Sequence, residues 1–341
     1  MVKDSRAVDI VYLWVDGSDP VWRNKRSQAR EALADSERAQ IAPYGDVEGR
    51  FRDNDELRYS LRALDRFFPQ HGHVYIVTDG QVPAWLRPHP QLTLIDHRAL
   101  IPAASLPTFD SCHIESYIHR IPNLAERYFY FNDDVFFGAP VDLEDWFWDE
   151  GVYACWSDDA AVAPGPLRRE SDSLENACRR SIQWLDAQPQ DGLHAGYRHT
   201  LQTFAHSPRA MRKSVLFALE AIAPDMFASV RSTVFRNWEK PSIVADFVTR
   251  WSLAHAKARV RSYSHAHVAS GEAQQASGME RVVRQLGDLH FFCINDTADD
   301  APARDPRLVG IRQTLQSLFA KKSRYELSPS ALDEGVLALS V

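Results

Sequence analysis

Acidic and amide side chains follow four of the most apolar stretches of the chain. They are Asp16 after VDIVYLWV, Asp79 after HVYIVT, Asn132-Asp133-Asp134 after YFYF, and Asn295-Asp296 after FFCI. Burying an unpaired carboxylate is costly, so we expect these groups to project from strand ends into a polar cleft. Carboxylate and amide oxygens gathered in one cleft would suit a hard divalent cation.

Each of these strand ends also has a simpler explanation, because Asp and Asn start turns and cap helices. The repetition at four places, twice as a run of neighbouring polar residues, favours a shared site over four unrelated turns.

His206 stands directly before Ser207 and Pro208, which are typical of an N-cap and a first helical turn. We therefore expect a helix to begin right after His206. Helix N-termini favour phosphate, and a histidine beside one is placed for proton transfer. The alternative is a surface histidine that flanks a cap. His265 and His267 form a weaker pair, and we assign them to structure or surface.

Arginines supply the complementary chemistry, because the guanidinium fork matches phosphate oxygens. Arg50 and Arg52 lie in RFRDND, and Arg231 and Arg236 lie in SVRSTVFRNWEK. Solvated or paired surface arginines are the simpler interpretation for each one alone.

The segments that position these residues alternate between strand and helix patterns. Strands are expected at 8–15, 73–80, 92–96, 128–131 and 289–297, and helices at 22–42, 54–68, 111–121 and 308–324. The alternation predicts an α/β fold with a mostly parallel, twisted sheet. In such sheets ligands bind beyond the carboxyl ends of the strands, where the polar groups lie.

Three parts of the chain differ in character. Residues 1–155 form the expected α/β core, and residues 156–285 form a mainly helical insertion with a mobile loop at 269–278. Residues 286–341 supply a returning strand and an amphipathic C-terminal helix. The apolar face of that helix has two interpretations: it packs on the domain, or it lies on a membrane surface with Lys321, Lys322 and Arg324.

Composition restricts the class of protein. The 341 residues carry a net charge of −7, which argues against a nucleic-acid partner. MVKDSRAVDI does not resemble a signal peptide, and no apolar run approaches the ~18 residues of a membrane span. The four cysteines are far apart and contain no CxxC pair, as expected for reduced thiols. We expect a cytoplasmic location, optionally peripheral at the inner face of the cell membrane, and a homo-oligomer is compatible with these features.

Longer motifs occur in one order along residues 8–297. They are VDIVYLWVDGSDP, RFRDNDELRYSLRAL, HVYIVTDGQVPAWL, LPTFDSCHIESYIHRIPNLAERYFYFNDDVFFG, HSPRAM and FCINDT. The chain thereby resembles the Stealth family of hexose-1-phosphate transferases, which includes bacterial capsular polysaccharide polymerases and the animal N-acetylglucosamine-1-phosphotransferase. The first two of the family's four regions are near verbatim. The third is looser, with His206-Ser207-Pro208 and Phe235-Arg236 matching and His199 as a competitor, and the fourth is reduced to FCINDT.

The resemblance implies a fold similar to the nucleotide-sugar glycosyltransferases (GT-A-like). It also implies transfer of a sugar 1-phosphate, typically N-acetylhexosamine 1-phosphate, from a UDP-sugar donor to a hydroxyl of a glycan or lipid-linked glycan. UMP is released and a phosphodiester forms, as in capsule and exopolysaccharide synthesis.

The resemblance and the needs of phosphoryl transfer together suggest roles for individual residues. Mg²⁺ (or Mn²⁺) would be held by Asp133 or Asp134 with Asp296, helped by Asn295 or Asn132. Arg236 would clamp the transferred phosphate, His206 or Asp134 would take the acceptor proton, and Glu115 would orient the donor sugar or a catalytic partner. The donor side would be lined by Asp16, Gly17, Arg52, Asp53, Asn54 and Asp79.

Two rival functions stay open at this point. One is an ordinary glycosyltransferase that releases UDP, in which the NDD run acts as an Asp-x-Asp metal motif. The other is a non-catalytic protein that binds nucleotides or polysaccharide.

Overall fold

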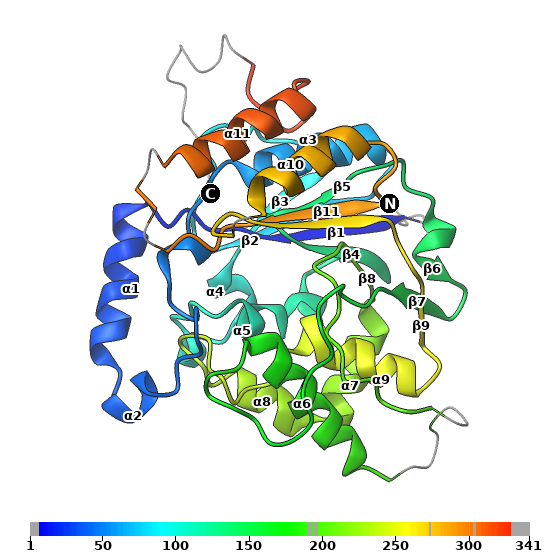
Figure 1. The fold of residues 1–341 in the computed structure, drawn as a ribbon. Coiled ribbons are helices and arrows are strands. Elements are labelled where there is room, and N and C mark those ends of the chain that lie inside the picture. Colours follow the sequence, from blue (N-terminus) through cyan, green and yellow to red (C-terminus); the bar gives the residue numbers. More distant parts are fainter. Residues whose placement is uncertain are drawn as a thin grey trace.

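A computed structural model describes residues 7–189, 193, 197–272, 274–299, 301–302 and 305–328. Its centre is a five-stranded sheet with the strand order β3-β2-β1-β4-β8 (Figure 1). β1 (Val8–Leu13), β2 (Val74–Thr78), β3 (Leu92–Asp96) and β4 (Arg127–Asn132) are parallel, and β8 (Arg209–Arg212) is antiparallel to β4. The predicted α/β class with a mostly parallel sheet is confirmed.

Helices cover both faces of this sheet because its strands are apolar on both sides (Figure 1). Ile10 and Tyr12 of β1 pack in one core, and Val11 and Leu13 pack in the other. The first core is closed by α3 (Glu56–Phe67), α10 (Gln275–Gln285) and α11 (Pro306–Leu318). The second is closed by α5 (Ser111–Glu115), α7 (Lys213–Ile222), α8 (Pro224–Val230) and α9 (Val248–Ala254).

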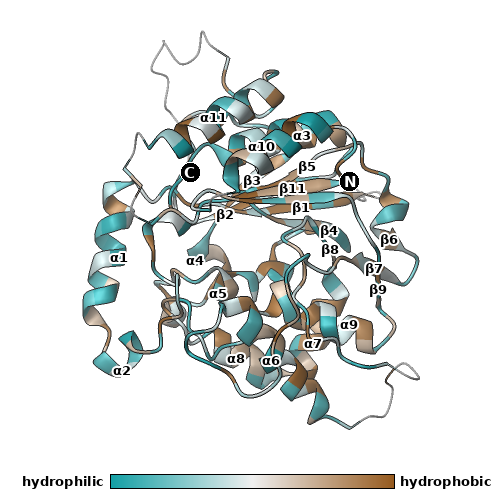
Figure 2. Ribbon diagram, in the orientation of Figure 1, coloured by the Kyte–Doolittle hydropathy of each residue, from teal (hydrophilic) through white to brown (hydrophobic). Residues whose placement is uncertain are grey.

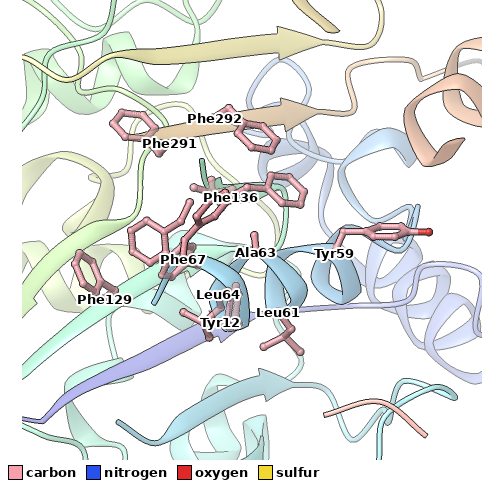
Figure 3. Packing of buried hydrophobic residues seen from close by; sticks show 14 of the residues in the cluster. Tyr12, Tyr59, Leu61, Ala63, Leu64, Phe67, Phe129, Phe136, Phe291 and Phe292 are labelled. Carbon is pink, nitrogen blue, oxygen red and sulfur yellow. The ribbon is translucent and has the colours of Figure 1, made fainter. Parts of the chain in front are cut away.

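Two three-stranded sheets flank the central one. β5 (Val135–Phe137) and β10 (His265–Ala269) pair with either side of β11 (Phe291–Asn295), and β7 (Gly151–Ala154) lies between β6 (Phe147–Trp148) and β9 (Ala258–Val260). In Figure 3, Phe136 of β5 lies between Ala63 of α3 and Phe292 of β11, on whose ring it stacks. The turn at Asp133 and Asp134 connects β4 of the central sheet to β5 of the second sheet.

The remaining elements lie on the periphery and in the connections. In Figure 2, α1 is largely hydrophilic in colour whereas β11 is largely hydrophobic. The helices are α1 (Pro20–Ala32), α2 (Asp35–Arg38), α4 (His97–Leu100) and α6 (Ser173–Asp186), with 3₁₀ turns at Glu48–Arg50, Ala103–Ser105, Ile118–Arg120 and Leu143–Asp145 and a π-helical turn at Ile243–Phe247.

The helix predicted directly after His206 is wrong. Residues Arg209–Arg212 form β8, in which Ala210 and Met211 pair with Phe129 and Tyr128 of β4. Both β8 residues are buried in the central cores, so burial against the sheet outweighs the local cap signal. The helix begins only at Lys213.

Residues 156–285 contain α6, α7, α8, α9 and α10, and they also contribute strands to all three sheets. They supply β8 to the central sheet, β9 to the third and β10 to the second. The returning strand 291–295 joins the second sheet rather than the central one. The expected mobile loop at 269–278 is shorter than predicted, because α10 begins at Gln275.

The apolar face of α11 packs inside the protein, which agrees with the first of its two interpretations. Leu308, Ile311 and Leu315 are buried in the core shared with α3 and α10. Within the described residues, no helix has the length and apolar character needed to cross a membrane.

Candidate active site

A cavity of about 800 Å³ opens at the carboxyl ends of the parallel strands. Its wall includes Leu13 at the end of β1 and Trp14 after it, Val77 of β2, Asn132 at the end of β4 and Asn295 at the end of β11. The polar residues after β4 and β11 line this cavity, whereas Asp16 after β1 and Asp79 after β2 do not.

One part of the wall carries Glu56, Asp133 and Asp134, which we call the acidic cluster. Glu56 is the first residue of α3, and the two aspartates form the turn between β4 and β5. Burial, followed by the proximity of Asp134 and Asp53, raises the pKa of Asp133 well above its ordinary value. Burial, followed by Asp133 and Asp53, does the same to the pKa of Glu56. These carboxylates therefore repel one another.

Asp134 has one engaged oxygen and one unengaged oxygen. Its Oδ2 accepts a hydrogen bond from the Cys293 thiol at 3.5 Å, whereas Oδ1 is buried without a hydrogen-bond partner. Burial raises the pKa of Asp134 to about 6, and Arg50 partly opposes this shift. An orphaned carboxylate oxygen among other acids fits a hard divalent cation such as Mg²⁺, which prefers oxygen ligands. The predicted magnesium ligands Asp133 and Asp134 thus place carboxylate oxygens at the cavity wall, where a cation could bind them.

Asp296 lines the cavity, but its carboxylate is engaged by protein donors. Oδ1 accepts from Ser270 Oγ at 2.9 Å and from the Ala298 amide at 3.0 Å. Oδ2 accepts from Arg52 Nη1 at 2.5 Å and from Asn54 Nδ2 at 3.2 Å. Binding of a cation by Asp296 would therefore require loss of one of these contacts, and the geometry suits a residue that positions Arg52.

Another part of the wall carries Arg50, Arg209 and Arg236, which we call the arginine cluster. Burial, followed by the proximity of Arg236, lowers the pKa of Arg50 to about 10, and burial lowers the pKa of Arg209. The Nε atoms of Arg50 and Arg236 are buried without hydrogen-bond partners. Three guanidinium groups, two of them with an unsatisfied donor, fit an anion with several oxygens, such as a phosphate.

Arg236 is oriented by neutral groups rather than by a close carboxylate. Nη2 donates to Ser111 Oγ at 2.6 Å and Nη1 donates to Ser173 Oγ at 3.4 Å, while Nε lies 3.8 Å from Asp110 Oδ1. Nε makes no hydrogen bond, so this donor is available to a ligand.

Glu115 lies on the arginine side of the cavity and is fixed by Tyr130. The Tyr130 hydroxyl lies 2.9 Å from Glu115 Oε1 and 2.9 Å from Asn132 Oδ1, while Glu115 Oε2 is buried without a partner. Burial raises the pKa of Glu115 to about 7, even though Arg236 and Arg209 lower it. The predicted residues Glu115 and Asn132 therefore share one hydrogen-bonded group.

His206 lines the cavity just before β8, with its ring stacked on that of His267 at 5.1 Å. Burial lowers the pKa of His206 to about 3, and His267 and the three arginines of the arginine cluster add to this shift. The imidazole is therefore neutral at pH 7, and it is a weak base as long as the arginine charges are not offset. Bound phosphate would offset the charge of the arginines and so raise the basicity of His206.

Several residues predicted for the donor side lie outside the cavity wall. Gly17 is required for a close approach, since a Cβ there would lie 2.3 Å from the Phe51 carbonyl oxygen. Asp16 Oδ1 accepts from the amide and hydroxyl of Ser18, and Asp79 is paired with Lys25 at 2.6 Å. Asn54 donates two hydrogen bonds to the Glu56 carboxylate, and the charge of Asp53 contributes to the raised pKa of Glu56. Of that predicted set, Arg52 lines the cavity.

The predicted site set omitted Glu56, Arg50 and Arg209. Glu56 was masked by its place in an amphipathic helix, where a first-turn acid is ordinary. Arg209 falls in the helix that the cap signal wrongly predicts, and Arg50 carries the same sequence signal as Arg52. The charge pattern of RFRDNDE is the signal that could have identified Arg50 and Glu56.

Two family models match parts of this chain. Residues 6–34 match the family model for Stealth protein conserved region 1, and residues 50–155 match that for conserved region 2. The second match ends just after β7 and includes all three residues of the acidic cluster.

Curated relatives carry one description. The chain is 33% identical over 330 residues to an exopolysaccharide phosphotransferase of Streptomyces coelicolor, covering 94% of this chain and 52% of that protein. A second one from the same organism is 31% identical, with 94% and 33% covered. Exopolysaccharide phosphotransferase CpsY of Mycobacterium leprae is 30% identical, with 85% and 51% covered. The chain thus spans between a third and about half of these relatives' lengths.

Among solved structures, the galactosyltransferase LgtC in complex with donor and acceptor sugar analogues aligns over 95% of this chain and 98% of that one. The TM-score is 0.41 and the sequence identity is 9%.

Proposed function

Because the chain carries conserved regions 1 and 2 of the Stealth family, we propose that it transfers a sugar 1-phosphate from a UDP-sugar to a glycan hydroxyl in exopolysaccharide or capsule synthesis. The names of its curated relatives support phosphotransfer in exopolysaccharide synthesis. The observation that carries the proposal is the presence of an acidic cluster and an arginine cluster in one strand-end cavity. A donor with a diphosphate and a divalent cation is complementary to both.

The acidic cluster would hold the cation. Asp133 and Asp134 are the expected ligands, with Glu56 contributing negative charge beside them. A bound Mg²⁺ (or Mn²⁺) would neutralise the donor diphosphate and polarise its phosphoryl oxygens.

The arginine cluster would hold the phosphate that is transferred. Arg236 is fixed by Ser111 and Ser173, so its fork is oriented before the donor arrives. Arg50 and Arg209 would supply further donors for the charge that develops on the phosphorus oxygens. Glu115 and Asn132, linked through Tyr130, would hydrogen-bond the donor sugar.

His206 would accept the proton of the acceptor hydroxyl. The acceptor oxygen attacks the phosphorus attached to the sugar, the bond from that phosphorus to the UMP oxygen breaks, and UMP leaves with the electron pair. The anionic donor offsets the arginines around His206, so the base becomes effective only when the donor is bound.

The nucleotide product decides between this reaction and an ordinary glycosyltransferase. The purified chain is incubated with Mg²⁺, a panel of UDP-sugars including UDP-N-acetylglucosamine, and a glycan acceptor. We expect UMP in the nucleotide analysis and a phosphodiester signal in the phosphorus-31 NMR spectrum of the product.

Release of UDP would overturn the proposal in favour of glycosyl transfer. Absence of any turnover across the panel would support a binding protein. Asp133→Asn serves as the inactive reference, and Asp149→Asn, at an exposed position, serves as the matched surface control.

A further inference from the structure

Two histidines and one cysteine converge beside the acidic cluster. The potential ligand atoms of His206, His267 and Cys293 all lie within 4.8 Å of one another. They come from the segment before β8, from β10 and from β11. We call them the imidazole–thiol cluster, and none of the roles proposed above uses His267 or Cys293.

The strand register holds two of these side chains together. His267 and Cys293 are register partners in the parallel pair of β10 and β11, so their side chains leave the same face of that sheet. The His206 ring stacks on the His267 ring, with 26° between the ring planes. The arrangement is therefore built by the second sheet and by the chain entering β8, rather than by one flexible loop.

The chemistry of this cluster differs from that of the acidic cluster. Hard cations such as Mg²⁺ take oxygen ligands, whereas two imidazoles and a thiolate select borderline and soft cations. Three protein ligands with a fourth open position are typical of zinc bound in an accessible site. The open position here is bordered by Asp134 Oδ2, which already accepts the Cys293 thiol hydrogen bond.

We infer that His206, His267 and Cys293 form a binding site for a zinc-class divalent cation next to the transfer site. On binding, the Cys293 thiol loses its proton to solvent and the sulfur bonds to the metal, while the two neutral imidazoles donate nitrogen lone pairs. Asp134 or water completes the coordination. No electron transfer is involved.

Occupation of this site has a consequence that rests on the proposed function. The bound ion would use the His206 lone pair that otherwise accepts the acceptor proton, and it would draw on Asp134. Zinc would therefore inhibit sugar-phosphate transfer, whereas Mg²⁺ supports it.

Cobalt(II) titration of the intact chain tests the site without any need for turnover. A thiolate ligand gives a sulfur-to-cobalt charge-transfer band in the near-ultraviolet, and excess Zn²⁺ should remove the band whereas excess Mg²⁺ should leave it. We expect the band in the wild type and in Cys112→Ser, since Cys112 also lines the cavity but lies outside the cluster. Cys293→Ser should lose it.

His267→Asn gives a second test that is independent of core packing, because His267 is exposed to the cavity whereas Cys293 is buried. We expect cobalt affinity to fall about 10- to 100-fold with the thermal melt unchanged. A wild type without the charge-transfer band, or a band that survives Cys293→Ser, would overturn the site.

The inhibition is measured separately by UMP release. Zinc should slow the wild type and Cys112→Ser, and it should slow His267→Asn less, each relative to its own rate without zinc. If no UDP-sugar is turned over while the cobalt spectra behave as expected, the proposed function fails and the metal site stands.

Discussion

The acidic and arginine clusters occupy the same cavity but are assembled in different ways. Most of the acidic cluster comes from one turn between two strands, with Glu56 added from the start of α3. The arginine cluster draws on a 3₁₀ turn, on β8 and on the loop before the π-helical turn. The first is local in sequence, whereas the second exists only after distant segments have packed.

The two clusters also differ in their electrostatic environments. Burial, followed by the proximity of other acids, raises the pKa values of Asp133 and Glu56, and burial, followed by the proximity of Arg236, lowers that of Arg50. Within the described residues, no hydrogen bond or ion pair joins an acid of the first cluster to an arginine of the second. The opposite charges of the two clusters are therefore not paired with one another, and a ligand carrying both a cation and phosphates would be complementary to both.

Asp134→Asn should have the largest effect. It removes the negative charge of the carboxylate whose Oδ1 is buried without a hydrogen-bond partner. We expect the UMP release rate to fall about 1,000-fold or more, through loss of cation binding. The folded protein should not lose stability, since the pKa of Asp134 is raised by burial and a neutral side chain avoids that cost. Rates across a Mg²⁺ titration, with thermal melts alongside, check both halves.

A variant that keeps its wild-type rate at limiting Mg²⁺ would contradict the role of the acidic cluster. Asp149→Asn, on the exposed surface, should match the wild type in both assays.

Glu115→Gln tests the contrast between the two clusters, because Glu115 is an acid that lies near the arginine cluster. Its ordinary pKa of 4.5 is raised to about 7 in the folded protein, chiefly by burial. A raised folded-state pKa gives stability that is present below the unfolded value and is lost as pH rises through the folded value. Above about pH 7 the charged form therefore costs the wild type on the order of 3 kcal/mol, which the glutamine avoids.

Urea denaturation across this pH range measures the difference. The variant should be more stable than the wild type near pH 8, and the two curves should converge as pH falls toward 4.5. A difference that does not change with pH would mean that the arginines, not burial, set the state of Glu115. Glu150→Gln, at an exposed position, is the control.

Sequence reasoning recovered the local cluster better than the distant one. Asp133 and Asp134 were identified because strand, turn and strand are contiguous there, so their position follows from alternation of apolar and polar residues. Arg209 was missed because the cap signal at Ser207 and Pro208 predicted a helix, whereas pairing with β4 makes a strand. The prediction that Asp79 lines the donor site fails in this structure, because Asp79 lies outside the cavity wall. It follows a parallel strand, as predicted, but its charge is paired with Lys25 of α1. Strand ends locate the cavity, while tertiary pairing decides which charges remain available.

Arg236→Lys tests whether the arginine cluster acts through its fork or only through its charge. Lysine keeps the charge but cannot contact Ser111, Ser173 and two phosphate oxygens together. We expect the transfer rate to fall about 100-fold at saturating donor. Arg98→Ala, whose side chain is 78% exposed, should leave the rate unchanged. A lysine variant with a near wild-type rate would show that charge alone suffices.

Asp79→Asn should have the smallest effect and defines where the charged site ends. Asp79 faces Lys25 at 2.6 Å, with 12% of its side chain exposed against 41% for Lys25, and it lies outside the cavity wall. A partly exposed pair of this kind contributes up to about 1 kcal/mol to stability. We therefore expect a small loss of stability, matched by Lys25→Ala, and a transfer rate within about twofold of the wild type. A loss of tenfold or more in rate from Asp79→Asn, absent from Lys25→Ala, would place the donor against Asp79. The acidic side of the site would then extend to the end of β2.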